Sequence, residues 1–395
     1  NSVNRRPHCN HRLFEPANGS VIPGATSVKL FRHHPVFDQN TLSMPIALPV
    51  DEVLPELTEA LRRSHAVVLK APAGAGKTTR VPPALLEAGF AEGGQIIMLE
   101  PRRIAARTSA ARIAYERGER TGQTVGYRIR FEDCVSRDTK ILVVTEGVLL
   151  RRIQDDPFLD GVSVVVFDEF HERRLDSDLA LAMVRRVQQT VRPDLRIVVM
   201  SATLDAAPIA RYLDDCPVFT QEVRQHPLTV EYTPASAQPL EEQVAAAVEK
   251  LLGAGDILVF LPGAAEIRRA SRALEPLARR ANLLVVPLHG DLSPSEQDKA
   301  VSPAEQPKVI LSTNVAETSV TIPGVTGVVD SGIAKVASYA HWNGLPTLDI
   351  KAVSQASCTQ RAGRAGRKSG DHQASGQECG CRERRQADSL PAGRG

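Results

Sequence analysis

The sequence predicts an α/β protein with two tandem, doubly wound parallel sheets. Short runs of apolar residues alternate with segments of helical periodicity, and this alternation occurs twice along the chain. Runs that are apolar at every position are typical of parallel strands that helices bury on both faces. With 395 residues, the chain is long enough for two domains that each bury a core of their own.

The first alternation lies within residues 51–200. Its predicted strands are at residues 66–70, 95–99, 141–144, 162–167 and 197–200. A helix is predicted between the last two strands, because Leu175, Leu179, Met183 and Val187 recur at a spacing of four residues. These elements predict the first doubly wound sheet.

The second alternation follows in the C-terminal half of the chain. Its predicted strands are at residues 257–261, 283–288, 309–312 and 327–330. Its predicted helices are at residues 240–252 and 264–279. We therefore expect a second parallel sheet that is also covered by helices.

Changes in composition divide the chain into five parts. Residues 1–43 show no sustained periodicity and residues 369–395 are polar and glycine-rich, so both ends are predicted to be disordered. Residues 223–239 contain several prolines and read as an extended connector. The two predicted domains are then residues 44–222 and residues 240–368.

Composition restricts the class of protein. The chain has 48 basic and 46 acidic residues, so its net charge of +2 does not attract polyanions as a whole, and a nucleic-acid surface must be local. Its six cysteines lack the spacing of a disulfide framework. It has no apolar run of about 18 residues and no signal-peptide pattern. We expect a cytoplasmic, monomeric protein that does not enter the membrane.

A phosphate-binding loop is predicted in the segment VVLKAPAGAGKTTR, residues 67–80. A strand, a loop of small residues and a helix start follow one another, so backbone N–H groups and the positive helix end converge on a phosphate. Lys77 would neutralise the β- and γ-phosphates of ATP, and Thr78 would offer a hydroxyl to Mg²⁺. The flanking elements favour this over a plain glycine-rich turn, although Ala71 replaces the first glycine of the pattern. The predicted contacts are Gly74, Ala75, Gly76, Lys77, Thr78 and Thr79.

Two carboxylates and a histidine follow the strand at residues 162–167, namely Asp168, Glu169 and His171. Ligands of open α/β sheets bind beyond the carboxyl ends of the strands, so these residues should face the same crevice as Lys77. Adjacent carboxylates repel each other unless a cation lies nearby, which predicts Mg²⁺ beside Asp168 and Glu169. Glu169 would orient or deprotonate the water that attacks the γ-phosphate. An acidic helix cap, the alternative, explains only one carboxylate.

The tetrapeptide DEFH at residues 168–171 resembles the signature of superfamily 2 DEAH-box helicases, with Phe170 where alanine is usual. The longer form DEFHER is similar to the bacterial HrpB-type branch of that family. Six further segments resemble family motifs in family order: EPRRIAART (100–108), TEGVLLRR (145–152), SAT (201–203), LVFLPG (258–263), STNVAETSVTIPGV (312–325) and QRAGRAGR (360–367). The resemblance covers about residues 50–368 and implies two RecA-like P-loop NTPase domains.

The resemblance also implies a catalytic role for the segment QRAGRAGR. Arg364 and Arg367 would reach from the second domain to the nucleotide in the first, where arginine fingers can raise the rate by about 10³–10⁵-fold. Gln360 would position the attacking water. The implied catalytic set is Glu169, His171, Gln360, Arg364 and Arg367.

Other residues acquire roles only through the resemblance. Ser201 and Thr203 would couple the nucleotide site to strand separation, and Arg112 would stack on the nucleobase. Contacts to the nucleic-acid backbone are implied in both domains, and they would tolerate any base sequence and weaken with salt. The implied contacts are Arg102, Arg103, Thr145, His289, Thr313, Asn314 and Thr318.

The sequence thus predicts an ATP-dependent helicase or translocase that hydrolyses ATP between two domains and moves along single-stranded nucleic acid. The resemblance favours RNA, although the motifs themselves do not separate RNA from DNA. One alternative is a regulatory P-loop ATPase that acts on a protein partner, which would need neither QRAGRAGR nor STNVAETS. Another is a truncated fragment with ATPase but little unwinding activity, because the resemblance stops near Lys368.

Overall fold

The computed structural model describes most of the two predicted domains. The described residues are 47–72, 74–202, 205–221, 230–231, 237–253, 255–317, 320, 322–339 and 345–365. The predicted disordered ends, residues 1–43 and 369–395, lie outside the described residues, and so does most of the predicted connector at residues 223–239. Residues 47–221 and 237–365 are called the first and second lobes below.

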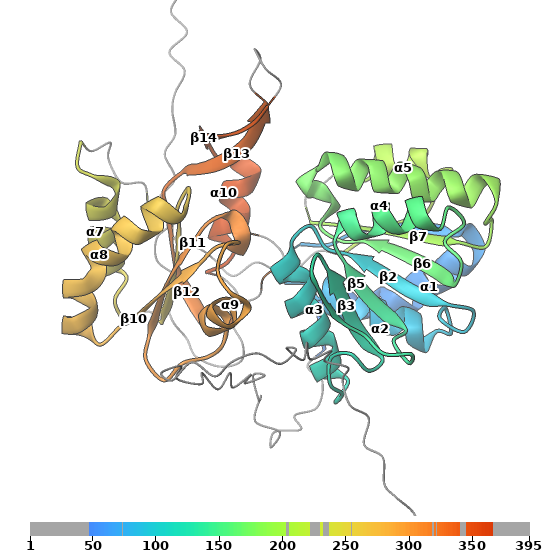
Figure 1. The fold of residues 1–395 in the computed structure, drawn as a ribbon, viewed down its shortest axis with the longest axis horizontal. Coiled ribbons are helices and arrows are strands. Elements are labelled where there is room, and N and C mark those ends of the chain that lie inside the picture. Colours follow the sequence, from blue (N-terminus) through green and yellow to red (C-terminus); the bar gives the residue numbers. More distant parts are fainter. Residues whose placement is uncertain are drawn as a thin grey trace, which may run out of the picture. The chain divides into compact units, whose positions relative to one another are not determined.

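The first lobe is built on an eight-stranded sheet with the order β4-β3-β5-β2-β6-β7-β1-β8 (Figure 1). Its neighbouring strands are parallel, except for the antiparallel pair β3–β4. The strands are β1 (Ala66–Lys70), β2 (Gln95–Leu99), β3 (Val125–Ile129), β4 (Glu132–Cys134), β5 (Ile141–Val144), β6 (Val162–Phe167), β7 (Arg196–Ser201) and β8 (Val218–Thr220).

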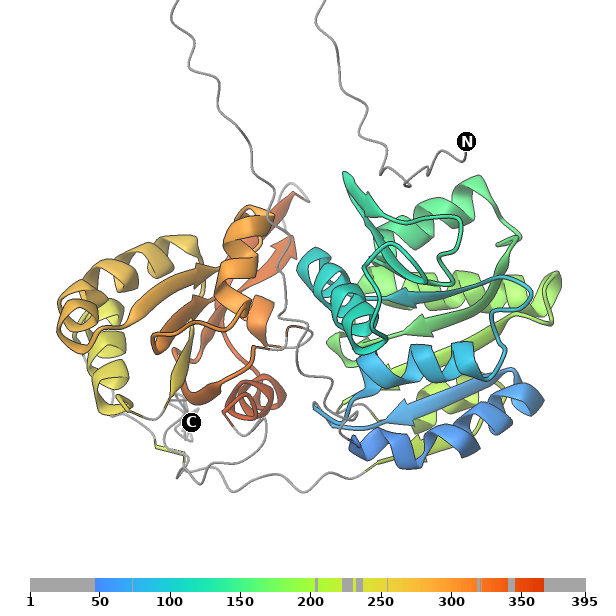
Figure 2. The ribbon, with the colours of Figure 1, turned by 90° about the horizontal axis from the view of Figure 1, so that it is seen from below.

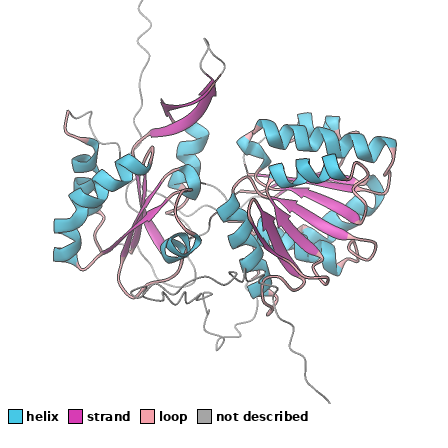
Figure 3. Ribbon diagram, in the orientation of Figure 1, coloured by secondary structure: helices cyan, strands magenta, loops and turns pink. Residues whose placement is uncertain are grey.

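Helices cover both faces of this sheet (Figure 3). Along β1, Val67 and Leu69 pack into the core of one face, while Ala66 and Val68 pack into the core of the other. The first face is covered by α1 (Leu54–Ser64), α2 (Lys77–Glu87) and α3 (Arg103–Glu116), which are nearest the viewer in Figure 2. The second face is covered by α4 (Glu146–Asp155), α5 (Leu175–Thr190) and α6 (Ala207–Tyr212). The predicted doubly wound sheet is confirmed.

The second lobe contains a four-stranded parallel sheet with the order β10-β11-β9-β12. Its strands are β9 (Asp256–Phe260), β10 (Leu284–Leu288), β11 (Lys308–Ser312) and β12 (Val325–Asp330). Helices α7 (Leu240–Lys250) and α8 (Ala264–Ala281) pack on one face, and α9 (Pro294–Val301) and the 3₁₀ helix η3 (Asn314–Ala316) pack on the other. This lobe confirms the second predicted α/β sheet.

Two elements of the second lobe follow its four-stranded sheet. Strands β13 (Ile333–Tyr339) and β14 (Pro346–Ala352) form an antiparallel hairpin, which the sequence did not predict. Helix α10 (Gln355–Ala362) begins at Ser354, whose hydroxyl oxygen accepts the Ser357 N–H at 3.1 Å. Helix α10 contacts β12, so the segment QRAGRAGR begins on an element docked to the sheet.

None of the helices in the described ranges combines the length and the apolar character that a membrane span requires.

Helix α5 forms where it was predicted, and of the four apolar residues that predicted it, Val187 is buried and Met183 packs partly against the core. Leu175 is 78% exposed and Leu179 is 46% exposed, whereas Leu181 is only 5% exposed and Val184 is fully buried. The buried face runs through residues 177, 180, 181, 184, 187 and 188. A strict spacing of four drifts around a helix of 3.6 residues per turn, so the predicted stripe leaves the sheet at its N-terminal end.

Two substitutions of the same residue type in α5 test this assignment of the buried face. Leu181→Ala should lower the free energy of unfolding by about 2–5 kcal/mol, because it leaves a cavity against the sheet. Leu175→Ala should change it by less than about 0.5 kcal/mol, because the side chain is exposed. Urea unfolding followed by circular dichroism measures both, and equal losses would contradict the assignment.

Candidate functional site

The predicted phosphate loop connects β1 to α2. Gly74 and Gly76 have φ angles of 89° and 95°, in the left-handed region that favours glycine. A Cβ atom on Gly76 would also lie 2.7 Å from the Cδ1 atom of Leu48. The loop therefore requires glycine at this point and leads directly into the N-terminus of α2, where backbone N–H groups can bind an anion.

Lys77 and Thr78 are the first two residues of α2 and contact different segments. Lys77 is only 4% exposed, and its Nζ lies 3.4 Å from the Pro72 carbonyl oxygen, so the ammonium folds back over the loop. The Thr78 hydroxyl donates to Oδ2 of Asp168 at 2.5 Å. The structure thus brings the phosphate loop and the end of β6 together at one edge of the sheet. This is the proximity that was predicted from the sequence.

An acidic turn follows β6 and continues into the 3₁₀ helix η2 (Phe170–Glu172). Glu169 has a φ of 48°, a left-handed conformation that costs a non-glycine residue about 1–3 kcal/mol. Its N–H donates to Oδ1 of Asp168 at 2.8 Å. Phe170 is buried and packs edge-on against Phe167, with ring centroids 6.0 Å apart. The phenylalanine of DEFH therefore anchors the turn in the core.

The electrostatics of this turn fit a bound cation. Burial, followed by the negative charge of Glu169, raises the pKa of Asp168 to about 6, although Lys77 and Thr78 oppose the shift. A divalent cation would favour the charged carboxylate. Mg²⁺ usually takes one or two protein oxygen ligands together with substrate phosphates, and Asp168 and Thr78 offer such oxygens. Within the described ranges, no cluster of three or more ligating side chains forms a complete protein cage.

Three segments of the chain meet at the ring of His171. Nδ1 lies 3.3 Å from Oε2 of Glu169, and the Ala202 N–H lies 3.4 Å from the same nitrogen. Nε2 lies 2.6 Å from the amide nitrogen of Gln360 in α10. A proton on Nδ1 satisfies the two shorter contacts, because the ring then donates to Glu169 and accepts from Gln360. His171 therefore links the acidic turn to the second lobe and lies against the residue that follows β7.

The arginine predicted to act as a finger is bound within its own lobe. Arg364 is 4% exposed, its Nε donates to the Glu317 carbonyl at 3.1 Å, and its Nη1 donates to the Val320 carbonyl at 2.7 Å. These two hydrogen bonds use two of the five N–H donors of its guanidinium. Arg367 lies outside the described residues.

Ser201, one of the two predicted coupling residues, is the last residue of β7. Ser201 is 1% exposed, and its carbonyl accepts the Ala71 N–H at 3.0 Å, so β7 is joined directly to the start of the phosphate loop. Thr203 lies outside the described residues. Arg112, predicted to stack on the nucleobase, is largely exposed, and its Nε donates to Oε1 of Glu116 at 2.6 Å.

Two of the predicted nucleic-acid contacts, Arg102 and Asn314, touch each other. One guanidinium nitrogen of Arg102 donates to Oδ1 of Asn314 at 3.4 Å, and another lies 3.3 Å from a carboxylate oxygen of Glu172. The sequence analysis missed Glu172. It stands three residues after Glu169 within a single turn, and that spacing is the signal that could have identified it.

The remaining predicted nucleic-acid contacts lie at the ends of elements. Arg103 is exposed at the start of α3, and Thr145 precedes the first residue of α4. In the second lobe, Nδ1 of His289 accepts the Asp291 N–H at 3.4 Å, and the hydroxyl of Thr313 caps η3. Thr318 lies outside the described residues.

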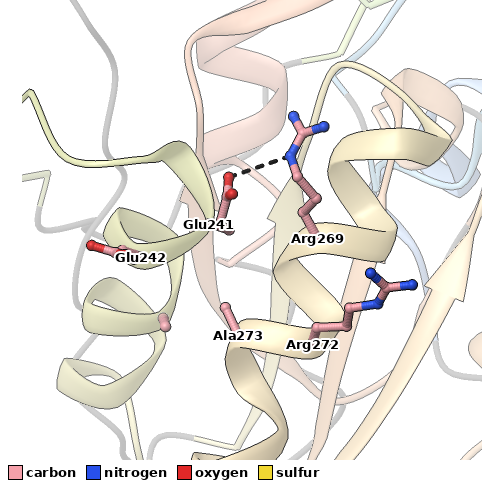
Figure 4. Close-up of a pocket in the computed structure, with 6 residues that line it drawn as sticks. Glu241, Glu242, Arg269, Arg272 and Ala273 are labelled. Carbon is pink, nitrogen blue, oxygen red and sulfur yellow. Dashed lines mark ion pairs between the residues drawn. The ribbon is translucent and has the colours of Figure 1, made fainter.

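A surface hollow of about 620 Å³ lies elsewhere, between α7 and α8 (Figure 4). Glu241 and Arg269 point toward each other across it and form an ion pair of 3.5 Å. Arg272 and Glu242, which also line it, point away from each other. The hollow contains none of the predicted site residues, so the loop and the acidic turn are the better candidate site.

Comparisons with known proteins match both lobes to families. Residues 51–211 match the DEAD/DEAH box helicase family, and residues 243–369 match the helicase conserved C-terminal domain. The chain is 49% identical over 328 residues to the ATP-dependent RNA helicase HrpB of Escherichia coli K12, covering 81% of this chain and 40% of that protein. It is 38% identical over 339 residues to the ATP-dependent RNA helicase HrpA homolog of Haemophilus influenzae, covering 84% of this chain and 26% of that protein.

Solved structures show the same likeness. A crystal structure of the Escherichia coli DEAH/RHA helicase HrpB aligns with a TM-score of 0.77 at 47% identity, covering 85% of this chain and 42% of that one. A crystal structure of the E. coli DExH-box NTPase HrpB gives a TM-score of 0.71 at 46% identity, covering 86% and 42%. The chain thus spans less than half the length of these relatives. With two helicase domains matched in order and a DEFH turn at the end of β6, it belongs to the DEAH-box group of superfamily 2 helicases.

Proposed function

We propose that this chain is an ATP-dependent RNA helicase that hydrolyses ATP in a site shared by its two lobes. The observation that carries the proposal is the hydrogen bond from Thr78 to Asp168, because it places the phosphate loop next to the acidic turn. A loop that binds phosphate and a turn that binds metal and water are the two parts that phosphoryl transfer to water requires.

Each part of the site has a distinct task. The loop and the N-terminus of α2 hold the phosphates, and Lys77 leaves the Pro72 carbonyl to neutralise the β- and γ-phosphates. Thr78 and Asp168 hold Mg²⁺, which supplies charge neutralisation across those phosphates when bound. Glu169 orients the attacking water and accepts its proton, and its carboxylate is held beside His171.

The second lobe completes the site through α10. Gln360 contacts His171, and this contact supports a role in holding the acidic turn and the attacking water in register. Arg364 becomes a finger when its hydrogen bonds to two backbone carbonyls are replaced by hydrogen bonds to phosphate. Arg367 is proposed to act beside it.

RNA is the proposed substrate because the similar proteins are named RNA helicases. The candidate contacts at the starts of α3, α4 and η3 are hydroxyls, an amide, guanidiniums and helix N-termini, which are groups that bind phosphate without reading bases. Opening and closing of the two lobes on ATP would change the spacing between these contacts and so move the protein along a strand. The free thiols at Cys134, Cys216 and Cys358 are consistent with a cytoplasmic protein.

Two substitutions separate ATP binding from hydrolysis. Lys77→Ala should abolish both, because the cation for the phosphates is lost. Glu169→Gln should lower the hydrolysis rate by about 10²–10⁴-fold while ATP still binds, because only proton acceptance is lost. Phosphate release with saturating poly(U) measures the rate, and a fluorescent ATP analogue measures binding. Glu241→Gln is the matched control and should leave both unchanged, whereas full activity in Glu169→Gln would remove Glu169 from this role.

Nucleic-acid dependence tests the substrate class. Poly(U) should stimulate ATP hydrolysis, and its affinity in filter binding should change when a non-hydrolysable ATP analogue is added. Arg103→Ala should reduce the slope of log affinity against log salt by about 0.7, the value for one lost phosphate contact on a single strand. Arg279→Ala, an exposed arginine on α8, is the control for overall charge.

Other outcomes of the same assays would identify the alternatives. Stimulation by duplex DNA alone would indicate a DNA translocase. Poly(U) affinity that does not respond to the nucleotide would favour a regulatory ATPase that acts on a protein.

A further inference from the structure

One side of α10 and the turn after it converge on a single residue, Glu317. The Ser357 hydroxyl and the Arg361 Nε both donate to the side chain of Glu317, the latter at 2.8 Å. Arg364 Nε donates to the Glu317 backbone carbonyl at 3.1 Å. Residues 357, 361 and 364 share one side of a helical turn, so Glu317 is held by a continuous row of donors.

Arg361 holds this group in the core of the second lobe. Its side chain is 1% exposed, and its Nη1 donates to Oδ1 of Asp330 at 2.8 Å. Its guanidinium carbon lies 4.8 Å from the centre of the Phe260 ring. One arginine therefore joins the carboxylates of Glu317 and Asp330 in a buried place, where removing one partner of such a group is strongly destabilising. Only arginine has the rigid fork that serves two acids at once.

Helices η3 and α10, which the Glu317–Arg361 ion pair joins, carry different parts of the proposed site. Glu317 directly follows η3, which begins with Asn314 after the cap residue Thr313, and both are candidate nucleic-acid contacts. Helix α10 carries Gln360, which contacts His171 beside the proposed catalytic turn. The Glu317–Arg361 ion pair is thus a short physical connection between the nucleic-acid side and the nucleotide side of this lobe.

We infer that Glu317 and Arg361 are positioning residues that fix η3 and α10 as one rigid body, so that nucleic acid bound at η3 sets the place of Gln360 at the nucleotide. This inference rests on the proposed function. Every contact within the pair and its neighbours lies inside the second lobe. The Glu317–Arg361 pair and the Ser357 hydroxyl join the two elements independently of Arg364.

A second buried ion pair of the second lobe, between Lys308 and Asp256, provides a matched control. Lys308 is 1% exposed, its Nζ donates to the carbonyls of Ala300 and Ser302 at 3.2 and 2.7 Å, and it lies 3.7 Å from Oδ2 of Asp256. It is the first residue of β11, at the end of the strand away from Thr313. Its loss should destabilise the lobe without disturbing the connection between η3 and α10.

The experiment compares Glu317→Gln and Arg361→Lys with Lys308→Met in the full chain. Glutamine keeps the shape of Glu317 without its charge, and lysine keeps the charge of Arg361 without the fork. We expect the factor by which poly(U) stimulates ATP hydrolysis to fall about 10-fold in the first two variants, the size of a typical coupling between sites. Binding of a fluorescent ATP analogue should stay within about twofold, because the phosphate loop is in the other lobe. Lys308→Met should lower the melting temperature and keep the stimulation.

Hydrogen–deuterium exchange tests the connection without depending on activity. The amides of Ala316 and Glu317 donate to Thr313 and Asn314, and they should exchange faster in both test variants and at the unaltered rate in Lys308→Met. If poly(U) does not stimulate the unaltered chain, the proposed function fails, and the exchange data still decide whether the connection exists. Unaltered exchange in both test variants, or an equal loss of stimulation in Lys308→Met, would overturn the inference.

Discussion

The structure depends on how negative charge is buried at the carboxyl ends of its parallel strands. At the end of β6, Asp168 and Glu169 are adjacent and almost inaccessible, and burial together with mutual repulsion raises the pKa of Asp168. The positive charge that opposes this belongs to Lys77, which also has a phosphate to bind. Two buried carboxylates of the first lobe therefore lie near a single lysine. A metal ion bound with a nucleotide would add positive charge that favours the charged carboxylates.

The second lobe also holds two largely buried carboxylates, and it pairs both of them with one of its own arginines. Glu317 and Asp330 also lie at the carboxyl-end side of a parallel sheet, but Arg361 is built in between them. A guanidinium is never neutral in a protein, so this cation stays between the two carboxylates whatever is bound. The first lobe thus buries two carboxylates near one lysine, while the second uses a permanent cation to hold its elements together.

Unusual backbone conformations shape the phosphate loop and the acidic turn of the first lobe. Gly74 and Gly76 take left-handed conformations in the phosphate loop, and Glu169 takes one in the acidic turn without being glycine. The strain at Glu169 persists because Phe170 is fixed in the core on one side and Asp168 is hydrogen-bonded on the other. The core therefore holds the proposed catalytic carboxylate in a position that its own conformational preference would not choose.

The sequence by itself determined the strand and helix order, the phosphate loop and the acidic turn, because apolar runs and glycine or carboxylate signals are local and need no partner to be recognised. It did not determine which side of α5 is buried, because Leu175 and Leu181 have the same chemistry and only docking on the sheet distinguishes them. The hairpin β13–β14 and the partners of Arg102, Arg361 and Arg364 were likewise decided by tertiary structure. The arginine contacts join residues that are tens of positions apart in the chain, and an arginine in a motif does not reveal whether it will meet a phosphate, a carboxylate or a backbone carbonyl.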